Sequence, residues 1–167
     1  MKCGGFDAVA DSNARVLILG TLPSVESLKR REYYANKTNR FWRIMGELAG
    51  ALPEMGYDDR LRKLKQRGIA LWDVCLSAER SGSLDSKIVM STVVPNDFDA
   101  FLHAHPHVCL ICFNGLTAEK IFRRKVTANV SAIRCELLPS SSAAHAVTHQ
   151  RKLSRWRNIL ESAITVN

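Results

Sequence analysis

Four short runs of apolar residues constrain the fold of this chain more than any other feature of its sequence. They span residues 15–20, 68–74, 107–113 and 131–138, and read RVLILG, GIALWDV, HVCLICF and SAIRCELL. Each run predicts a β-strand, because large apolar and β-branched side chains are typical of strands. Three runs are almost continuously hydrophobic, which is expected when both faces of a parallel sheet are covered, whereas a strand exposed on one face would alternate.

Helical periodicity fills the segments between these runs. Apolar residues repeat along one helical face in residues 39–52 and again after Thr148, near the end of the chain. Capping residues predict three shorter helices, at Asp58 or Asp59, at Asn96 and at Thr117. This alternation predicts an α/β fold over a single domain, residues 1–167, built as a three-layer sandwich with a central four-stranded parallel sheet flanked by helices.

The composition is that of a folded domain, with 46% hydrophobic and 24% charged residues. No apolar run approaches the roughly 20 residues of a membrane-spanning helix, and residues 1–13 lack the order of a signal peptide. We therefore expect a cytoplasmic protein without membrane contact. The five cysteines are an odd number and lie in apolar stretches, which fits reduced thiols.

The chain is basic. Its 24 Lys and Arg residues outnumber its 16 Asp and Glu residues and give a formal net charge of +8 at pH 7. A polyanion such as nucleic acid therefore fits as a partner.

Parallel α/β sheets bind ligands beyond the carboxyl ends of their strands, so the loops that follow the four runs form the candidate site. These loops are residues 20–40, 75–87, 114–115 and 139–148. The first is longer than a simple turn between strand and helix requires, which suggests a function.

The first loop lacks the glycine spacing and the lysine of nucleotide-binding loops, which disfavours a kinase or a dehydrogenase. Its segment 33–42 (YYANKTNRFW) combines aromatic rings with cations, a mixture that suits an extruded base or a single strand of nucleic acid. Asn39 can cap the following helix, recognise a base or position a water, and spacing alone leaves these roles open.

Two further places offer polar groups. The fourth loop, with LPSSSAAHA at 138–146, carries hydroxyls and amides that can grip phosphate oxygens, although a plain polar connection would have the same composition. Asp73 stands near the end of the second run, where it can hold water, read a base or make a structural hydrogen bond.

Several motifs in a fixed order carry a resemblance to a known family. They are GTLPS at 20–24, YYAN at 33–36 with NRFW at 39–42, GSLD at 82–85, FNG at 113–115, and LPS at 138–140 with His145. The chain resembles the uracil-DNA glycosylase superfamily over nearly its whole length, and most of all its hypoxanthine-DNA glycosylase branch, which is related to mismatch-specific uracil and thymine glycosylases. The resemblance implies a monofunctional DNA glycosylase that flips out a deaminated base, foremost hypoxanthine, and hydrolyses its N-glycosidic bond to leave an abasic site.

The chain also departs from other branches of this family. Those branches carry an Asp or Asn in the first motif, where residues 21–23 here read TLP, and they often carry a His where Leu138 stands. The resemblance implies that Asn39 takes over as the catalytic residue. No lysine lies in the motifs that form the pocket, so we expect no lyase step through a Schiff base.

The resemblance also implies which residues meet the DNA. Stacking on the base is assigned to Tyr34 or Phe41, and the other base-binding residues are Gly20, Thr21, Leu22, Asn36 and Asp73. Contacts with the DNA strands are assigned to Pro23, Ser24, Arg40, Pro139, Ser140, Ser141 and Ser142, with His145 as the candidate plug for the space that the base leaves.

We expect no cofactor and no metal. Cys109 and Cys112 lie three residues apart in one predicted strand and so point to opposite faces, which does not suit an iron-sulfur cluster. His103, His105 and His107 alternate like metal ligands, but they surround a helix end and Pro106 interrupts them.

The expected partner of this monomer is double-stranded DNA with a deaminated base, or single-stranded DNA. Excision of uracil or of mismatched bases on the same scaffold is the nearest alternative. A non-catalytic binder of damaged or single-stranded DNA, and a small-nucleotide-binding α/β protein, are alternatives of other classes. Release of a free base separates the enzyme from both binders, and salt-sensitive DNA binding separates the two binders from each other.

Overall fold

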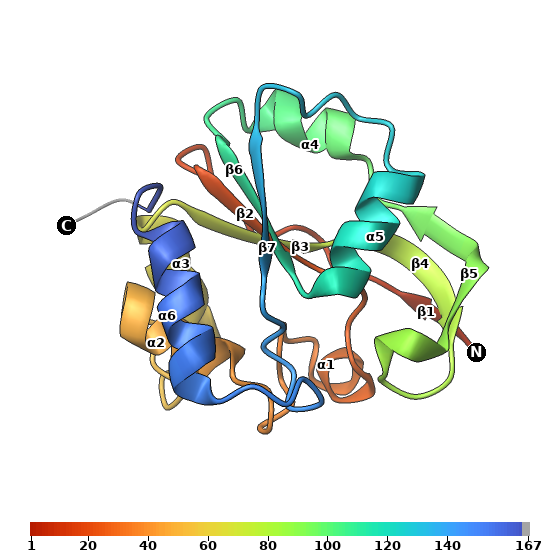
Figure 1. The fold of residues 1–167 in the computed structure, drawn as a ribbon, viewed down its shortest axis with the longest axis horizontal. Coiled ribbons are helices and arrows are strands. Elements are labelled where there is room, and N and C mark those ends of the chain that lie inside the picture. The colour runs from red at the N-terminus through yellow and green to blue at the C-terminus, as the bar shows by residue number, and fades with distance from the viewer. Residues whose placement is uncertain (165–167) are drawn as a thin grey trace.

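The computed structural model describes residues 1–164 and has a four-stranded parallel sheet at its centre (Figure 1). The strands follow the order β3-β2-β6-β7, and every neighbouring pair is parallel. The four apolar runs supply these strands, which are β2 (Val16–Gly20), β3 (Ile69–Asp73), β6 (Leu110–Asn114) and β7 (Arg134–Leu138). The predicted central sheet is thereby confirmed.

Helices cover both faces of this sheet (Figure 1). On one side lie α2 (Phe41–Ala49), α3 (Tyr57–Gln66) and α6 (His149–Leu160). On the other side lie α4 (Phe98–Ala104) and α5 (Leu116–Lys125). The three-layer α/β architecture is therefore also confirmed.

The central strand β2 shows why its run is continuously hydrophobic. Val16 and Ile18 are fully buried in the core shared with α2, α3 and α6. Leu17 and Leu19 are fully buried in the core shared with α4 and α5. Because successive side chains of a strand point to opposite faces, a strand covered on both sides must be apolar throughout.

The helix starts agree with the predicted caps only in part. Thr148 caps α6, with its hydroxyl accepting a hydrogen bond from the backbone N–H of Arg151. The cap of α4 is Asp97 rather than Asn96, whose side-chain amide instead donates to the backbone oxygen of Asp73. The other predicted caps lie within the first turns of α3 and α5, after the capping glycines Gly56 and Gly115.

A second sheet was not predicted. It is antiparallel in the order β1-β4-β5, with strands β1 (Lys2–Gly4), β4 (Cys75–Arg80) and β5 (Ile88–Pro95). The expectation of a loop at 75–87 was wrong, because the chain passes from β3 through Val74 directly into β4. Burial does not alternate strictly along β4, because register shifts between Cys75 and Glu79 move the buried positions from Cys75 to Ala78 and Arg80.

Two short helices lie in the connections after β2 and between β4 and β5. They are α1 (Val25–Arg30), within the first loop, and the 3₁₀ helix η1 (Asp85–Lys87), just before β5. Both lie toward the end of the molecule where the first loop and the loop after β7 meet (Figure 1). Among the described residues, no helix has the length and apolar character needed to cross a membrane.

Candidate active site

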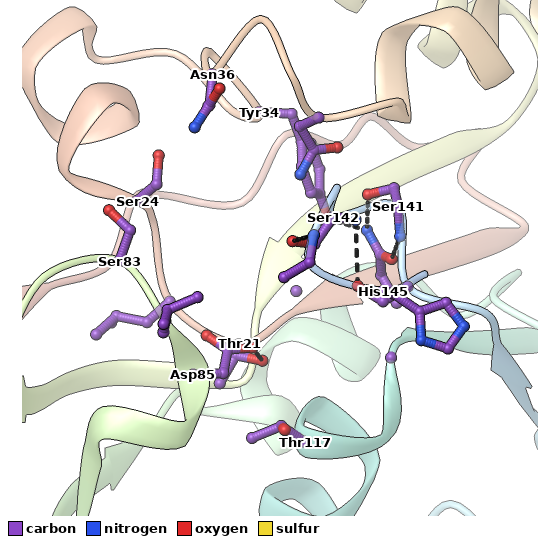
Figure 2. Close-up of a pocket in the computed structure, with 18 of the residues that line it drawn as sticks. Thr21, Ser24, Tyr34, Asn36, Ser83, Asp85, Thr117, Ser141, Ser142 and His145 are labelled. Atoms are coloured by element: carbon purple, nitrogen blue, oxygen red, sulfur yellow. Dashed lines mark hydrogen bonds between the residues drawn. The ribbon is translucent and has the colours of Figure 1, made fainter. Parts of the chain in front are cut away.

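A cavity of about 560 Å³ opens at the carboxyl ends of the parallel strands (Figure 2). Its volume is in the range of sites that hold a small molecule or a single base. Most of the residues predicted for the site line it: Gly20, Thr21, Leu22, Pro23, Ser24, Tyr34, Asn36, Asn39, Asp73, Ser140, Ser141, Ser142 and His145.

Three predicted residues do not line the cavity. Phe41 is fully buried in the core behind Tyr34, so of the two aromatic candidates only Tyr34 reaches the cavity. Arg40 links two loops through its backbone N–H, which donates to the oxygen of Ser141 at 2.9 Å. The backbone oxygen of Pro139 accepts a hydrogen bond from the indole of Trp156.

Tyr34 is held by contacts on two sides. Its ring stacks on Phe41 with centroids 3.8 Å apart, and its hydroxyl accepts a hydrogen bond from the side-chain amide of Asn114 at 3.1 Å. Its backbone has a φ of 55°, an uncommon left-handed conformation for a residue other than glycine. The core thus fixes an aromatic ring that lines the cavity, and Phe41 covers one face of that ring.

Asn39 lines the cavity while also serving the start of α2. Its side-chain oxygen accepts a hydrogen bond from the backbone N–H of Phe41 at 2.9 Å. Because a backbone N–H can only donate, the atom that faces it is the oxygen, and the NH₂ group is left to donate elsewhere. Asn39 was predicted as the N-cap of α2, but the N-cap is the next residue, Arg40. Asn39 nevertheless accepts a hydrogen bond from a backbone amide at the start of this helix.

Asp73 lies against Gly20 at the end of β3. A Cβ atom on Gly20 would lie only 2.5 Å from the Asp73 Oδ1, so the close approach requires glycine here. Asp73 is 3% exposed, and its Oδ2 has no hydrogen-bond partner. Burial, together with the negative charge of Asp85, raises the pKa of Asp73 to about 7. The structure therefore buries a carboxyl group that is partly protonated at neutral pH.

Asp85 lines the same cavity from η1 in a different environment. It accepts a hydrogen bond at 2.7 Å from the hydroxyl of Thr21, and its Oδ1 lies 3.6 Å from Nη1 of Arg80. Burial raises the pKa of Asp85 above its ordinary value, and the Thr21 hydroxyl and the Arg80 charge act in the opposite direction.

Arg80 anchors the first loop from behind. This fully buried guanidinium donates to the backbone oxygens of Leu22, Pro23 and Gly82. It thereby connects the loop after β2 to the segment that carries Asp85.

The loop after β7 is tied to the sheet by Asn114, the last residue of β6. The Asn114 side chain accepts from the backbone N–H of Ser141 and donates to the Ser141 hydroxyl, at 2.8 Å in each case (Figure 2). Ser141 is buried as a result. The neighbouring Gly115 has a φ of 101°, and a Cβ atom there would lie 3.0 Å from that of Ser140. Glycine thus lets the two loops approach closely.

The same loop is anchored from behind by a lysine. Lys152 of α6 is fully buried, and its ammonium group donates to the backbone oxygen of Ser142 at 2.8 Å. Burial and the nearby charge of Arg40 lower the pKa of Lys152. Beyond Ser142 the loop is exposed, and His145 lies at the edge of the cavity (Figure 2).

The serine hydroxyls predicted to grip phosphate also shape their own loops. Ser24 caps α1 by accepting from the backbone N–H of Ser27. Ser140 and Ser142 accept from backbone N–H groups two residues further on. Ser140 and Ser142 each keep a hydroxyl proton that can be donated to a ligand. The Ser24 hydroxyl does not, because it already donates to the hydroxyl of Ser27.

The described residues show no metal centre. Within residues 1–164, no three His, Cys, Asp or Glu side chains come together in a way that could hold a metal ion. Cys112 is buried in β6, whereas Cys109 just before it is exposed. The ring of His105 stacks on Phe101 and its Nδ1 lies 2.9 Å from the Phe101 oxygen.

Sequence reasoning did not assign four residues that build the cavity or support it. Asn114 and Asp85 stand in the FNG and GSLD motifs, so a signal for both was present. Arg80 and Lys152 carry no comparable signal, because a lone basic residue gives no indication that folding will bury it.

Comparisons with known proteins agree on one family. Residues 6–162 match the family model described as the uracil DNA glycosylase superfamily. The chain is 40% identical over 159 residues to a protein from Methanosarcina acetivorans named hypoxanthine DNA glycosylase, covering 93% of this chain and 96% of that protein. A protein of the same name from Methanosarcina barkeri is 34% identical over 157 residues, with the same coverage.

A solved structure is similar over the whole fold. It is a solution NMR structure of a candidate uracil DNA glycosylase from Methanosarcina acetivorans, with a TM-score of 0.79 and 38% sequence identity. The similarity covers 97% of this chain and 98% of that chain.

Proposed function

The chain belongs to the uracil DNA glycosylase superfamily, and from this premise we propose that it is a DNA glycosylase that releases hypoxanthine from DNA. The observation that carries the proposal is the 40% identity, over 93% of the chain, to a protein named hypoxanthine DNA glycosylase. The reaction hydrolyses the bond between the base and the deoxyribose and leaves an abasic site. DNA is its partner, specifically a duplex in which adenine has been deaminated.

The cavity supports recognition of a base that has left the helix. A small enzyme cannot reach a stacked base, so the nucleotide must rotate out, at a cost of a few kcal/mol that is smallest where pairing is already weak. In this proposal the base enters the cavity and lies against the ring of Tyr34, which Phe41 backs from the core.

Asp73 suits the edge that distinguishes hypoxanthine. That edge presents an N1–H donor beside an O6 acceptor. A protonated carboxyl group matches both, because it accepts through one oxygen and donates through the other. The raised pKa of Asp73, about 7, and its unpartnered Oδ2 support this role.

Asn39 acts as a donor in this proposal. Its oxygen is occupied by the Phe41 amide, so its NH₂ group is available to stabilise the negative charge that develops on the leaving base. Beside the helix cap, the sequence left two roles open for Asn39, and the geometry supports contact with the base better than activation of water.

The rim of the cavity supports binding of the flanking strand. Ser140 and Ser142 accept hydrogen bonds from backbone amides through their hydroxyl oxygens and keep their hydroxyl protons, which can be donated to phosphate oxygens. His145 lies in the exposed part of the same loop and is proposed to enter the space vacated by the base. We propose that the protein acts as a monomer on duplex DNA.

The test is a base-release assay on duplexes that contain hypoxanthine, uracil or mismatched thymine, with the wild type and with Asn39→Ala. We expect the wild type to release hypoxanthine fastest, and the variant to be slower by about 100-fold to 1000-fold, as for the loss of one preorganised donor. Asn158→Ala, an exposed change on α6 away from the cavity, is the matched control and should match the wild type.

The other outcomes are distinct. Faster release of uracil than of hypoxanthine would favour a uracil glycosylase. Salt-sensitive DNA binding without release of any base would reject the enzymatic proposal in favour of a DNA-binding protein.

A further inference from the structure

Hydrolysis of an N-glycosidic bond is accelerated by a group that holds the attacking water and accepts its proton. The first loop offers no carboxylate for this, since residues 21–23 are Thr, Leu and Pro. Asn39 cannot accept that proton, because a carboxamide is not a base, and its only acceptor atom already binds the Phe41 amide. We propose that Asp85 is a second catalytic residue, the carboxylate that orients and deprotonates the attacking water. This inference rests on the proposed function.

The position of Asp85 fits this role. It lines the cavity, and 36% of its side chain is exposed, so water can reach it. Its Oδ2 is bonded to the hydroxyl of Thr21, which stands beside Leu22 in the first loop (Figure 2). A carboxylate from η1 thus reaches the part of the cavity where the first motif itself supplies none.

Two neighbours of Asp85 favour its ionised form and oppose the burial that raises its pKa. Arg80 places a buried positive charge 3.6 Å from its Oδ1, and the Thr21 hydroxyl donates to its Oδ2. Asp73 has no such support, since its Oδ2 has no partner and the side chain is shielded from water. Two carboxyl groups in one cavity with different environments are typical of a pair that divides proton donor and proton acceptor roles.

The step balances with water as the only co-reactant. The bond between C1′ of the sugar and the base breaks, and its electron pair leaves with the base. The water oxygen bonds to C1′ and loses one proton to the Asp85 carboxylate. The base takes up one proton from solvent, and Asp85 returns one proton to solvent.

Among the charged groups that face Asp85, Arg80 on β4 favours its ionised form. The charge of Asp85 in turn contributes to raising the pKa of Asp73 at the end of β3, of Cys75 on β4 and of Tyr34 in the first loop. Asp73 titrates near neutral pH, at a pKa of about 7. The rate should therefore rise with pH as Asp85 ionises and fall as Asp73 loses the proton that it offers to the base. The result is a bell-shaped profile.

The experiment measures single-turnover release of hypoxanthine across a pH series, with saturating wild type, Asp85→Asn and Asp59→Asn. Asparagine keeps the shape of the side chain and can still accept from Thr21, but it cannot take a proton. We expect Asp85→Asn to be at least about 100-fold slower, to lose the rising limb, and to have its falling limb at lower pH, because the charge that raises the pKa of Asp73 is gone. Asp59→Asn removes an exposed, Arg-paired carboxylate on α3 and should follow the wild type.

A second variant keeps the inference testable if Asp85→Asn disturbs folding. Thr21→Val removes the hydroxyl that stabilises the Asp85 charge, so the rising limb should move to higher pH. A merely structural role for Asp85 would not move that limb.

Two results would overturn the inference: an Asp85→Asn rate within about threefold of the wild type, or a rising limb that stays unchanged in both variants. Either result would leave the proposed function intact, provided that the wild type releases hypoxanthine. Absence of base release by the wild type would reject the proposed function itself.

Discussion

The two loops that wall the cavity are held by the same device but differ in charge. The wall after β2 has its backbone oxygens bound by the buried Arg80, and the wall after β7 has the Ser142 oxygen bound by the buried Lys152. Arg80 also faces the carboxylate of Asp85, whereas within residues 1–164 no carboxylate lies within salt-bridge distance of Lys152. The first wall is thus locally neutralised and suits proton chemistry, while the second remains positive and suits a phosphate.

Removal of Arg80 should have the largest effect on stability. Arg80→Met leaves Asp85 without its counter-charge and three backbone oxygens without their donor, so we expect a loss of about 3–5 kcal/mol in the free energy of unfolding. Urea denaturation measures it. Arg62→Met breaks an exposed pair with Asp59 and should cost at most about 1 kcal/mol. Equal losses in the two variants would show that the buried guanidinium does not anchor the wall.

Asp73 should make the stability of the wild type fall with rising pH. Its pKa in the folded state, about 7, lies above the ordinary 3.8, so the folded state retains a proton that the unfolded state releases. The loss of unfolding free energy caused by the buried Asp73 is therefore absent below about pH 4, grows between about pH 4 and pH 7, and is constant above that.

We expect Asp73→Asn to remove this cost and to be more stable than the wild type at pH 8 by up to about 4 kcal/mol, at 1.36 kcal/mol per pKa unit. Thermal or urea unfolding at pH 5 and pH 8 measures the difference. A stability difference between the two proteins that does not change with pH would contradict the raised pKa.

Lys152→Met should have a smaller effect, mainly on DNA binding. It removes the hydrogen bond to Ser142 and the positive charge of the second wall, so we expect about tenfold weaker binding at low salt. The slope of log affinity against log salt should decrease by no more than about 1, the value for one lost phosphate contact, because the buried ammonium group does not touch the phosphate itself. Fluorescence anisotropy at several salt concentrations measures both quantities.

The control for this prediction lies on the same helix. Arg157→Met removes an exposed charge from α6 and should leave the slope unchanged. If both variants reduce the slope equally, the charge of Lys152 acts only through the overall charge of the protein.

The parallel sheet could be predicted because its strands are buried on both faces and carry a strong apolar signal. The antiparallel sheet could not be predicted, because β4 follows β3 with only Val74 between them and its sequence, CLSAER, has no regular alternation of apolar and polar residues. In the site, the loops and most of the lining residues could be located from their place after the strands. The burial of Phe41 could not be predicted. An aromatic residue at a helix start can face the core or the ligand, and the residues that pack against it decide which.

By itself, the sequence determined which segments must be buried and therefore which loops gather at one end of the sheet. Only the tertiary structure decided which charges meet there. Thr21 and Asp85 are 64 residues apart in the chain, and Arg80 and Pro23 are 57 apart. Local patterns encode burial and helix or strand periodicity, whereas the protonation state of a carboxyl group depends on neighbours that folding brings within a few ångströms.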